Sequence, residues 1–134
     1  MDNSNKRTVT FGLIALIVVI GLLVYASRVS GGPGKLDGFA QCLKEKGALF
    51  YGAFWCSHCQ NQKAIFGSSK KYLPYIECST PDGRGQLPIC AANKIASFPT
   101  WVFPDMSTTT GEIPLAILSE KTGCPLPVEE SATK

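Results

Sequence analysis

Residues 48–60 of the chain read ALFYGAFWCSHCQ, and no other stretch is as informative about the architecture. The run Ala48–Trp55 is apolar and aromatic, which is typical of a strand buried on both faces of a sheet. Cys56 and Cys59 follow it directly, and we expect a helix to start at this pair and continue to Lys71. The pattern therefore predicts a strand that carries a cysteine pair to the start of a helix.

This placement favours redox chemistry at the pair. Unpaired backbone N–H groups and the helix dipole stabilise a thiolate at a helix N-terminus, which is where Cys56 would lie. His58, the single histidine of the chain, can stabilise that thiolate further when it is protonated. The two-residue gap lets the second sulfur reach the first. We expect Cys56 to be the nucleophile and Cys59 to resolve the mixed disulfide.

The alternative interpretation of the pair is half of a zinc site. Such a site would need Cys78 and Cys90 as its other ligands, because the chain has no second histidine. Zinc sites usually show a second close pair of ligands, whereas these cysteines are single and far apart in the sequence. The spacing favours a redox pair, and we expect neither a metal nor a cofactor.

Short apolar segments on both sides of the pair complete a small domain. The first segment, Leu36–Lys46, has its apolar residues at helical spacing and ends at a glycine. The further predicted elements are strands at Tyr75–Cys78, Thr100–Phe103 and Thr108–Gly111, a short helix at Leu87–Lys94 and a last helix at Pro114–Thr122. This order of elements predicts an α/β sandwich around a four-stranded sheet. The polar, proline-containing residues 125–134 are expected to be a disordered tail.

The N-terminal part of the chain predicts a membrane segment. Residues 8–26 carry no charge, and at a rise of about 1.5 Å per residue they cross a hydrocarbon core roughly 30 Å thick. A cleaved secretory signal is the alternative, but its apolar core is usually only about 7–15 residues long. We expect an uncleaved anchor, with residues 1–7 as a short cytoplasmic tail and the Gly- and Ser-rich residues 27–35 as a flexible linker.

Charge and cysteine content bear on the compartment. The net charge of +3 comes from 13 basic and 10 acidic side chains without a basic cluster, so nucleic-acid binding is not expected. The positive charges on the two sides of the segment differ little, so the positive-inside bias is slight. The very short N-terminal tail and six cysteines favour an N-inside topology with the domain outside the cytoplasm.

A second motif, Phe98-Pro99-Thr100, precedes the predicted strand TWVF. Alone it is an ordinary proline at a strand entry. Together with Trp55-Cys56 and the second cysteine it resembles the thioredoxin superfamily, and residues 36–124 would form the thioredoxin-like domain. The resemblance implies that Pro99 is cis, which is accessible to a bond before proline, and packs beside the disulfide. It also implies that Trp55, Phe98 and Thr100 contact an extended substrate peptide.

The resemblance extends to a narrower group. Phe50–Gly67, FYGAFWCSHCQNQKAIFG, is similar to the thioredoxin-like domain that is fused to, or partners, bacterial and plant homologues of vitamin K epoxide reductase. The similarity covers roughly Phe39 to Cys124. Ser57 departs from the proline usual there, and no multi-helix quinone-reducing domain is present. The resemblance thus implies a separate quinone-linked membrane oxidoreductase as partner. The buried acid of thioredoxins is replaced by Phe50, which leaves the proton path open.

The same resemblance implies a disulfide between Cys78 and Cys90. Whether that bond is structural or relays electrons is open, and we favour a structural bond because neither cysteine has a close partner in sequence that would strain it. Cys42 lies on the apolar face of the first predicted helix, and Cys124 follows the last one. Cys42 is either a buried free thiol or paired with Cys124. We expect pairing, because an odd thiol is hazardous outside the cytoplasm.

These observations predict a membrane-anchored oxidoreductase that exchanges disulfides with protein thiols, as an oxidant or carrier. A disulfide reductase or isomerase would use the same pair of cysteines. A Cys/His metal-binding module and a disulfide-stapled anchoring domain without catalysis are the alternatives from other classes. Stapling alone would not need the Trp55-Cys56 and Phe98-Pro99-Thr100 motifs.

Overall fold

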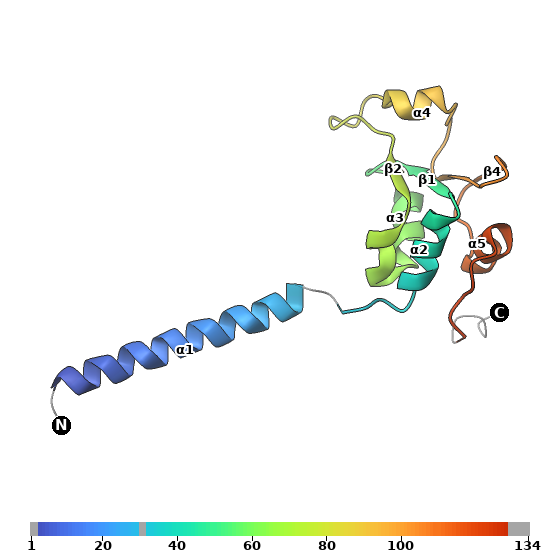
Figure 1. Ribbon diagram of the computed structural model, residues 1–134. Coiled ribbons are helices and arrows are strands. Elements are labelled where there is room, and N and C mark those ends of the chain that lie inside the picture. Colours follow the sequence, from blue (N-terminus) through green and yellow to red (C-terminus); the bar gives the residue numbers. More distant parts are fainter. Residues whose placement is uncertain (1–2, 30–31, 129–134) are drawn as a thin grey trace. The chain divides into compact units, whose positions relative to one another are not determined.

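A computed structural model describes residues 3–29 and 32–128 of the chain (Figure 1). The chain divides into two compact units, Met1–Gly32 and Pro33–Lys134, and each is considered by itself. Residues 1–2, 30–31 and 129–134 lie outside the described part. They belong to the predicted cytoplasmic tail, linker and disordered tail, so those predictions are untested there.

The first unit contains one long helix, α1 (Asn3–Val29). Its stretch Val9–Ser27 has a mean hydropathy of 2.7 over 19 residues, so by length and composition this helix can cross a membrane. A signal sequence would pass the same test, and the anchor remains a prediction. The helix continues through Ser27–Val29, which had been predicted as flexible linker. The Ser27 hydroxyl donates a hydrogen bond of 2.8 Å to the Val24 carbonyl, which accommodates the polar residue within the helix.

The second unit is built on a four-stranded sheet in the order β2-β1-β3-β4. The central strand β1 (Leu49–Gly52) runs parallel to β2 (Tyr75–Glu77) and antiparallel to β3 (Thr100–Val102). The edge strand β4 (Thr108–Thr110) is antiparallel to β3. This mixed sheet with flanking helices confirms the predicted thioredoxin-like sandwich preceded by a helix.

The helices lie where they were predicted, with shorter bounds. They are α2 (Asp37–Glu45), α3 (Ser57–Ala64), the 3₁₀ helix η1 (Gly67–Tyr72), α4 (Pro88–Ala92) and α5 (Leu115–Thr122). The prediction of a single helix up to Lys71 was wrong. Helix α3 ends at Ala64 and η1 begins at Gly67, because Gly67 adopts a left-handed φ of 53° that an α-helix cannot continue through. Gly123 (φ 71°) ends α5, as predicted.

Strand β1 ends at Gly52, three residues before its predicted end at Trp55. The Cys56 amide donates to the Ala53 carbonyl at 3.0 Å, which closes a turn and lifts residues 53–55 out of the sheet. The prediction that this strand is buried on both faces is confirmed. Phe50 faces one side and stacks on Trp101 with ring centroids 4.7 Å apart, whereas Tyr51 packs with Ile95 on the other side.

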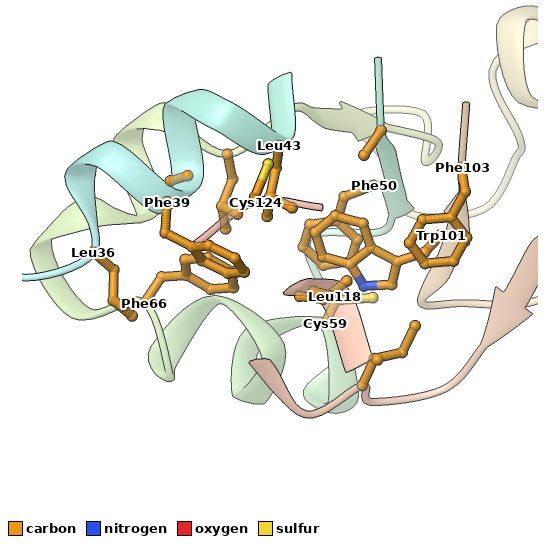
Figure 2. Packing of buried hydrophobic residues seen from close by; sticks show 14 of the residues in the cluster. Leu36, Phe39, Leu43, Phe50, Cys59, Phe66, Trp101, Phe103, Leu118 and Cys124 are labelled. Atoms are coloured by element: carbon orange, nitrogen blue, oxygen red, sulfur yellow. The ribbon is translucent and has the colours of Figure 1, made fainter. Parts of the chain in front are cut away.

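The larger core lies on the Phe50 side of the sheet (Figure 2). Phe39 from α2 stacks on Phe66 at 6.0 Å, and Leu118 from α5 is fully buried in the same cluster. Complete burial of an aromatic or aliphatic side chain stabilises a fold by about 1.5–3 kcal/mol. Cys59 is part of this cluster, so the core fixes the position of one sulfur of the pair.

Two disulfides tie the unit together. One joins Cys42 of α2 to Cys124, with a Cα–Cα distance of 5.8 Å and a sequence separation of 82. The other joins Cys78 to Cys90 of α4, with a Cα–Cα distance of 5.6 Å and a separation of 12. On the chain-entropy model, closing the shorter loop stabilises by about 3 kcal/mol, and closing the longer one by about 4.5 kcal/mol.

Candidate active site

The sulfur of Cys56 lies at the start of α3. Cys56 occupies the N-cap position, and its Sγ accepts a hydrogen bond of 3.3 Å from the backbone N–H of Cys59. A backbone N–H donor and the positive end of the helix dipole both favour a negative sulfur at this place. Cys56 is 7% exposed and Cys59 is 0% exposed, and both are free thiols. The first sulfur is therefore the one that a substrate can approach.

Cys59 is enclosed between α3 and the sheet. Burial in apolar surroundings, together with the hydrogen bond to Cys56, raises the pKa of the Cys59 thiol to about 12. A Cβ atom added to Gly52 would lie 2.9 Å from the Cys59 Sγ, so glycine is needed where β1 passes this sulfur. The Cys59 thiol is thus shielded from solvent.

The loop before the pair is held by side chains of β2, of the segment that follows β2, and of α3. Trp55 is 57% exposed, and its indole N–H donates to the Ser79 Oγ at 2.9 Å. The Phe54 amide donates to the Glu77 Oε1 at 3.2 Å. The Gln60 side-chain amide donates to the Phe54 carbonyl at 2.8 Å. These bonds fix the backbone that presents Trp55 beside the first sulfur.

Of the segment Phe98–Thr100, which is predicted to contact substrate, Phe98 lies close to this loop. The Phe98–Pro99 peptide bond is cis, and Pro99 is buried. The rings of Phe98 and Trp55 meet edge to face with centroids 6.1 Å apart, so two of the predicted contact residues are brought together. The Thr100 side chain is 5% exposed and donates to the Ser97 carbonyl at 2.7 Å. Thr100 is therefore enclosed within the sheet, between its partner residues Tyr51 of β1 and Thr110 of β4.

His58 has a partner that the sequence did not reveal. Its Nδ1 lies 2.6 Å from the Glu112 Oε1, and the Asn61 side-chain amide donates to the same oxygen at 3.1 Å. These two hydrogen bonds, that of His58 first, hold the pKa of Glu112 below its usual range. The pairing joins α3 to the segment before α5, which no local pattern indicates.

A second group of polar residues lies behind the pair, on α3 and β2. The Lys63 Nζ lies 3.2 Å from the centroid of the Tyr75 ring. The Tyr75 hydroxyl donates to the Glu77 Oε2 at 2.7 Å. Lys63 and Glu77 are near the motif in sequence, but only the fold shows that Tyr75 joins them.

The remaining cysteines do not support the zinc alternative. Cys78 and Cys90 are bonded to each other in this structure, so neither is available as a thiolate ligand. Within residues 3–29 and 32–128, no group of three or more His, Cys, Asp and Glu side chains is arranged to hold a metal ion. Neither disulfide includes Cys56 or Cys59.

In comparison with known proteins, no family model matches the chain. The chain is 48% identical over 89 residues to the protein named thiol-disulfide oxidoreductase LTO1 from Arabidopsis thaliana. The aligned part covers 63% of this chain but only 23% of that relative, so the chain spans about a quarter of its length. The fold is thioredoxin-like, and a relative is named an oxidoreductase.

Proposed function

We propose that this chain is a thiol–disulfide oxidoreductase acting on protein thiols, with Cys56 as nucleophile and Cys59 as resolving thiol. One observation carries the proposal: Cys56 presents a hydrogen-bonded sulfur at the start of the helix, and Cys59, three residues later, carries a fully buried sulfur. Exchange through a mixed disulfide needs this asymmetry, because the Cys56 sulfur forms the bond to the substrate and the Cys59 sulfur later breaks it. The similarity to a named thiol-disulfide oxidoreductase supports it.

In the reducing direction, the Cys56 thiolate attacks one sulfur of a substrate disulfide, and the other substrate sulfur leaves as a thiolate. Cys59 loses its proton and attacks the Cys56 Sγ, which forms the Cys56–Cys59 disulfide and releases the second substrate sulfur. Two electrons pass from the pair to the substrate, and the oxidising direction is the reverse. Trp55, Phe98 and the cis Pro99 segment are proposed to hold the substrate chain, and His58 to stabilise the thiolate.

We further propose that the pair acts as an oxidant or carrier with a quinone-linked membrane oxidoreductase. A disulfide whose reduced form is stabilised as a thiolate is the stronger oxidant, and the helix start at Cys56 provides that stabilisation. If α1 anchors the domain outside the cytoplasm, the pair and a membrane partner are held at the same membrane, which raises their effective concentration relative to each other. A pair potential clearly above thioredoxin's roughly −270 mV is expected, whereas one at or below it would make the chain a reductase or isomerase.

The test of the activity uses the full chain in detergent. It should catalyse insulin disulfide reduction with added dithiol, and oxidation of a dithiol peptide with added disulfide, both with and without a metal chelator. Cys56→Ser should abolish both reactions. Activity that requires added metal would favour the Cys/His metal-binding module instead, and activity that survives the loss of Cys56 would refute the proposed role.

A further inference from the structure

Resolution by Cys59 requires a buried thiol to become a thiolate, and Cys56 does not supply the positive charge that would stabilise it. The thiol must ionise before it can attack, yet it is fully buried in the apolar cluster. Phe50 on the adjacent strand is also fully buried and stacks on Trp101, so it can neither take up a proton nor offer a charge. A charged group must therefore reach Cys59 from elsewhere.

The geometry brings Lys63 to this sulfur. Lys63 is four residues after Cys59 in α3, so the two side chains leave the same face of the helix. A Cβ atom on Gly52 would be 2.9 Å from the Cys59 Sγ and 2.9 Å from the Tyr75 Cε2, so sulfur and ring approach each other over this glycine. The Lys63 Nζ lies against that same ring, 3.2 Å from its centroid.

Tyr75 and Glu77, the two polar neighbours of Lys63, are already joined to each other and to the backbone by hydrogen bonds. The Glu77 Oε1 accepts from the backbone amides of Phe54 and Ser79, and its Oε2 accepts from Tyr75. Burial and this bond to Glu77 raise the pKa of the Tyr75 hydroxyl, which keeps its proton. Among these three residues, Lys63 is the one with a positive charge, and a nearby positive charge is what stabilises a thiolate.

We propose that Lys63 is the positioning residue that lets Cys59 ionise during resolution, with Tyr75 and Glu77 holding its ammonium group near the sulfur. The inference rests on the proposed exchange function. In the step, the Cys59 thiol gives its proton to solvent, and the ammonium group stabilises the thiolate. The thiolate attacks the Cys56 Sγ, the bond between Cys56 and the substrate breaks, and the electron pair leaves on the substrate sulfur, which then takes up a proton.

The charges around Lys63 agree with this role. Burial lowers the pKa of Lys63, and Lys70 of η1 lowers it further, whereas Glu77, Cys59 and Cys56 raise it. The interaction with the sulfurs is reciprocal: a positive Lys63 lowers the pKa of Cys59 against the effect of burial. Removal of the ammonium group should therefore raise the pH at which Cys59 becomes reactive.

The experiment separates the two steps of exchange in the full chain. Reduced protein is mixed with oxidised glutathione, and release of the first and second glutathione thiols is followed by stopped flow as a function of pH. Lys63→Met removes the charge, and Lys63→Arg restores it. Lys121→Met is the matched control, since Lys121 also lies over an aromatic ring, that of Phe103 at 5.0 Å, in α5.

We expect Lys63→Met to form the mixed disulfide within about twofold of the wild-type rate and to resolve it roughly 10–100-fold more slowly at pH 7, which is the scale on which loss of a nearby opposite charge changes the ionised fraction of a thiol. Its resolution rate should reach half-maximum at higher pH. Lys63→Arg should recover most of the rate, and Lys121→Met should match wild type.

Two results would overturn the inference alone. Resolution by Lys63→Met at the wild-type rate with an unchanged pH profile would show that the charge is not used. Equal slowing of both steps would show that Lys63 acts on the fold or on Cys56. Absence of either step in the wild-type chain would instead refute the exchange function, and this inference with it.

Discussion

At the residue scale, the two sulfurs of the pair differ in their access to solvent and in their chemistry. Cys56 is 7% exposed at the helix start, whereas Cys59 is fully buried with its pKa raised to about 12. Because thiolates are the species that alkylate, iodoacetamide at pH 6–7 should label Cys56 of the reduced chain well before Cys59. Peptide mass spectrometry over time measures the order. Equal labelling, or faster labelling of Cys59, would contradict the assigned roles.

A glycine next to the buried sulfur provides a second test at this scale. A Cβ at Gly52 would come within 2.9 Å of the Cys59 Sγ and the Tyr75 ring, so Gly52→Ala forces both to move. Overpacking of this kind costs about 1–3 kcal/mol of unfolding free energy. Gly38→Ala is the control, because a Cβ at this helical position meets nothing within 4 Å, and it should gain up to about 1 kcal/mol. Denaturant midpoints followed by tryptophan fluorescence would show this, and a neutral Gly52→Ala would refute the close approach.

At the scale of elements, the two disulfides should contribute unequally. The Cys42–Cys124 bond closes a separation of 82 residues and the Cys78–Cys90 bond one of 12. On the chain-entropy model, removing both cysteines of the first pair by alanine should cost about 4.5 kcal/mol, and of the second about 3 kcal/mol. Unfolding free energies of the two double variants measure the difference. The reverse order would indicate that strain or packing, not loop closure, dominates.

Elements that depend on neighbouring residues were predictable, and contacts between distant residues were not. The apolar run before Cys56 identified the central strand because alternation is lost when both faces are buried. The break of the helix at Gly67 was missed, since a single glycine inside a helical pattern is often tolerated. The pairing of His58 with Glu112 joins residues that share no local pattern. Phe50 revealed that the usual acid is lacking, but the place of Tyr75 beside Lys63 depends on the register of β2 with β1.

At the scale of the whole molecule, the orientation of the chain in a membrane is open to direct test. The stretch Val9–Ser27 has the length and hydropathy of a membrane span. We expect a reporter that is active only outside the cytoplasm to be active when fused after Lys134, and the protein to stay with membranes in high salt. An inactive reporter with an active cytoplasmic counterpart would reverse the topology. Release of a soluble product ending at Ala26 would show a cleaved signal.

The measurement that tests the central claim most directly is capture of the mixed disulfide. Full-length Cys59→Ser, reduced and then incubated with insulin, should accumulate a covalent adduct in which the Cys56 Sγ is bonded to an insulin cysteine, because the resolving thiol is absent. Cys56→Ser should form no adduct under the same conditions, and wild type should show only a transient one. Mass spectrometry after acid quenching identifies the bonded cysteines. An adduct through Cys59 in Cys56→Ser at a comparable rate, or no adduct in Cys59→Ser, would contradict the account.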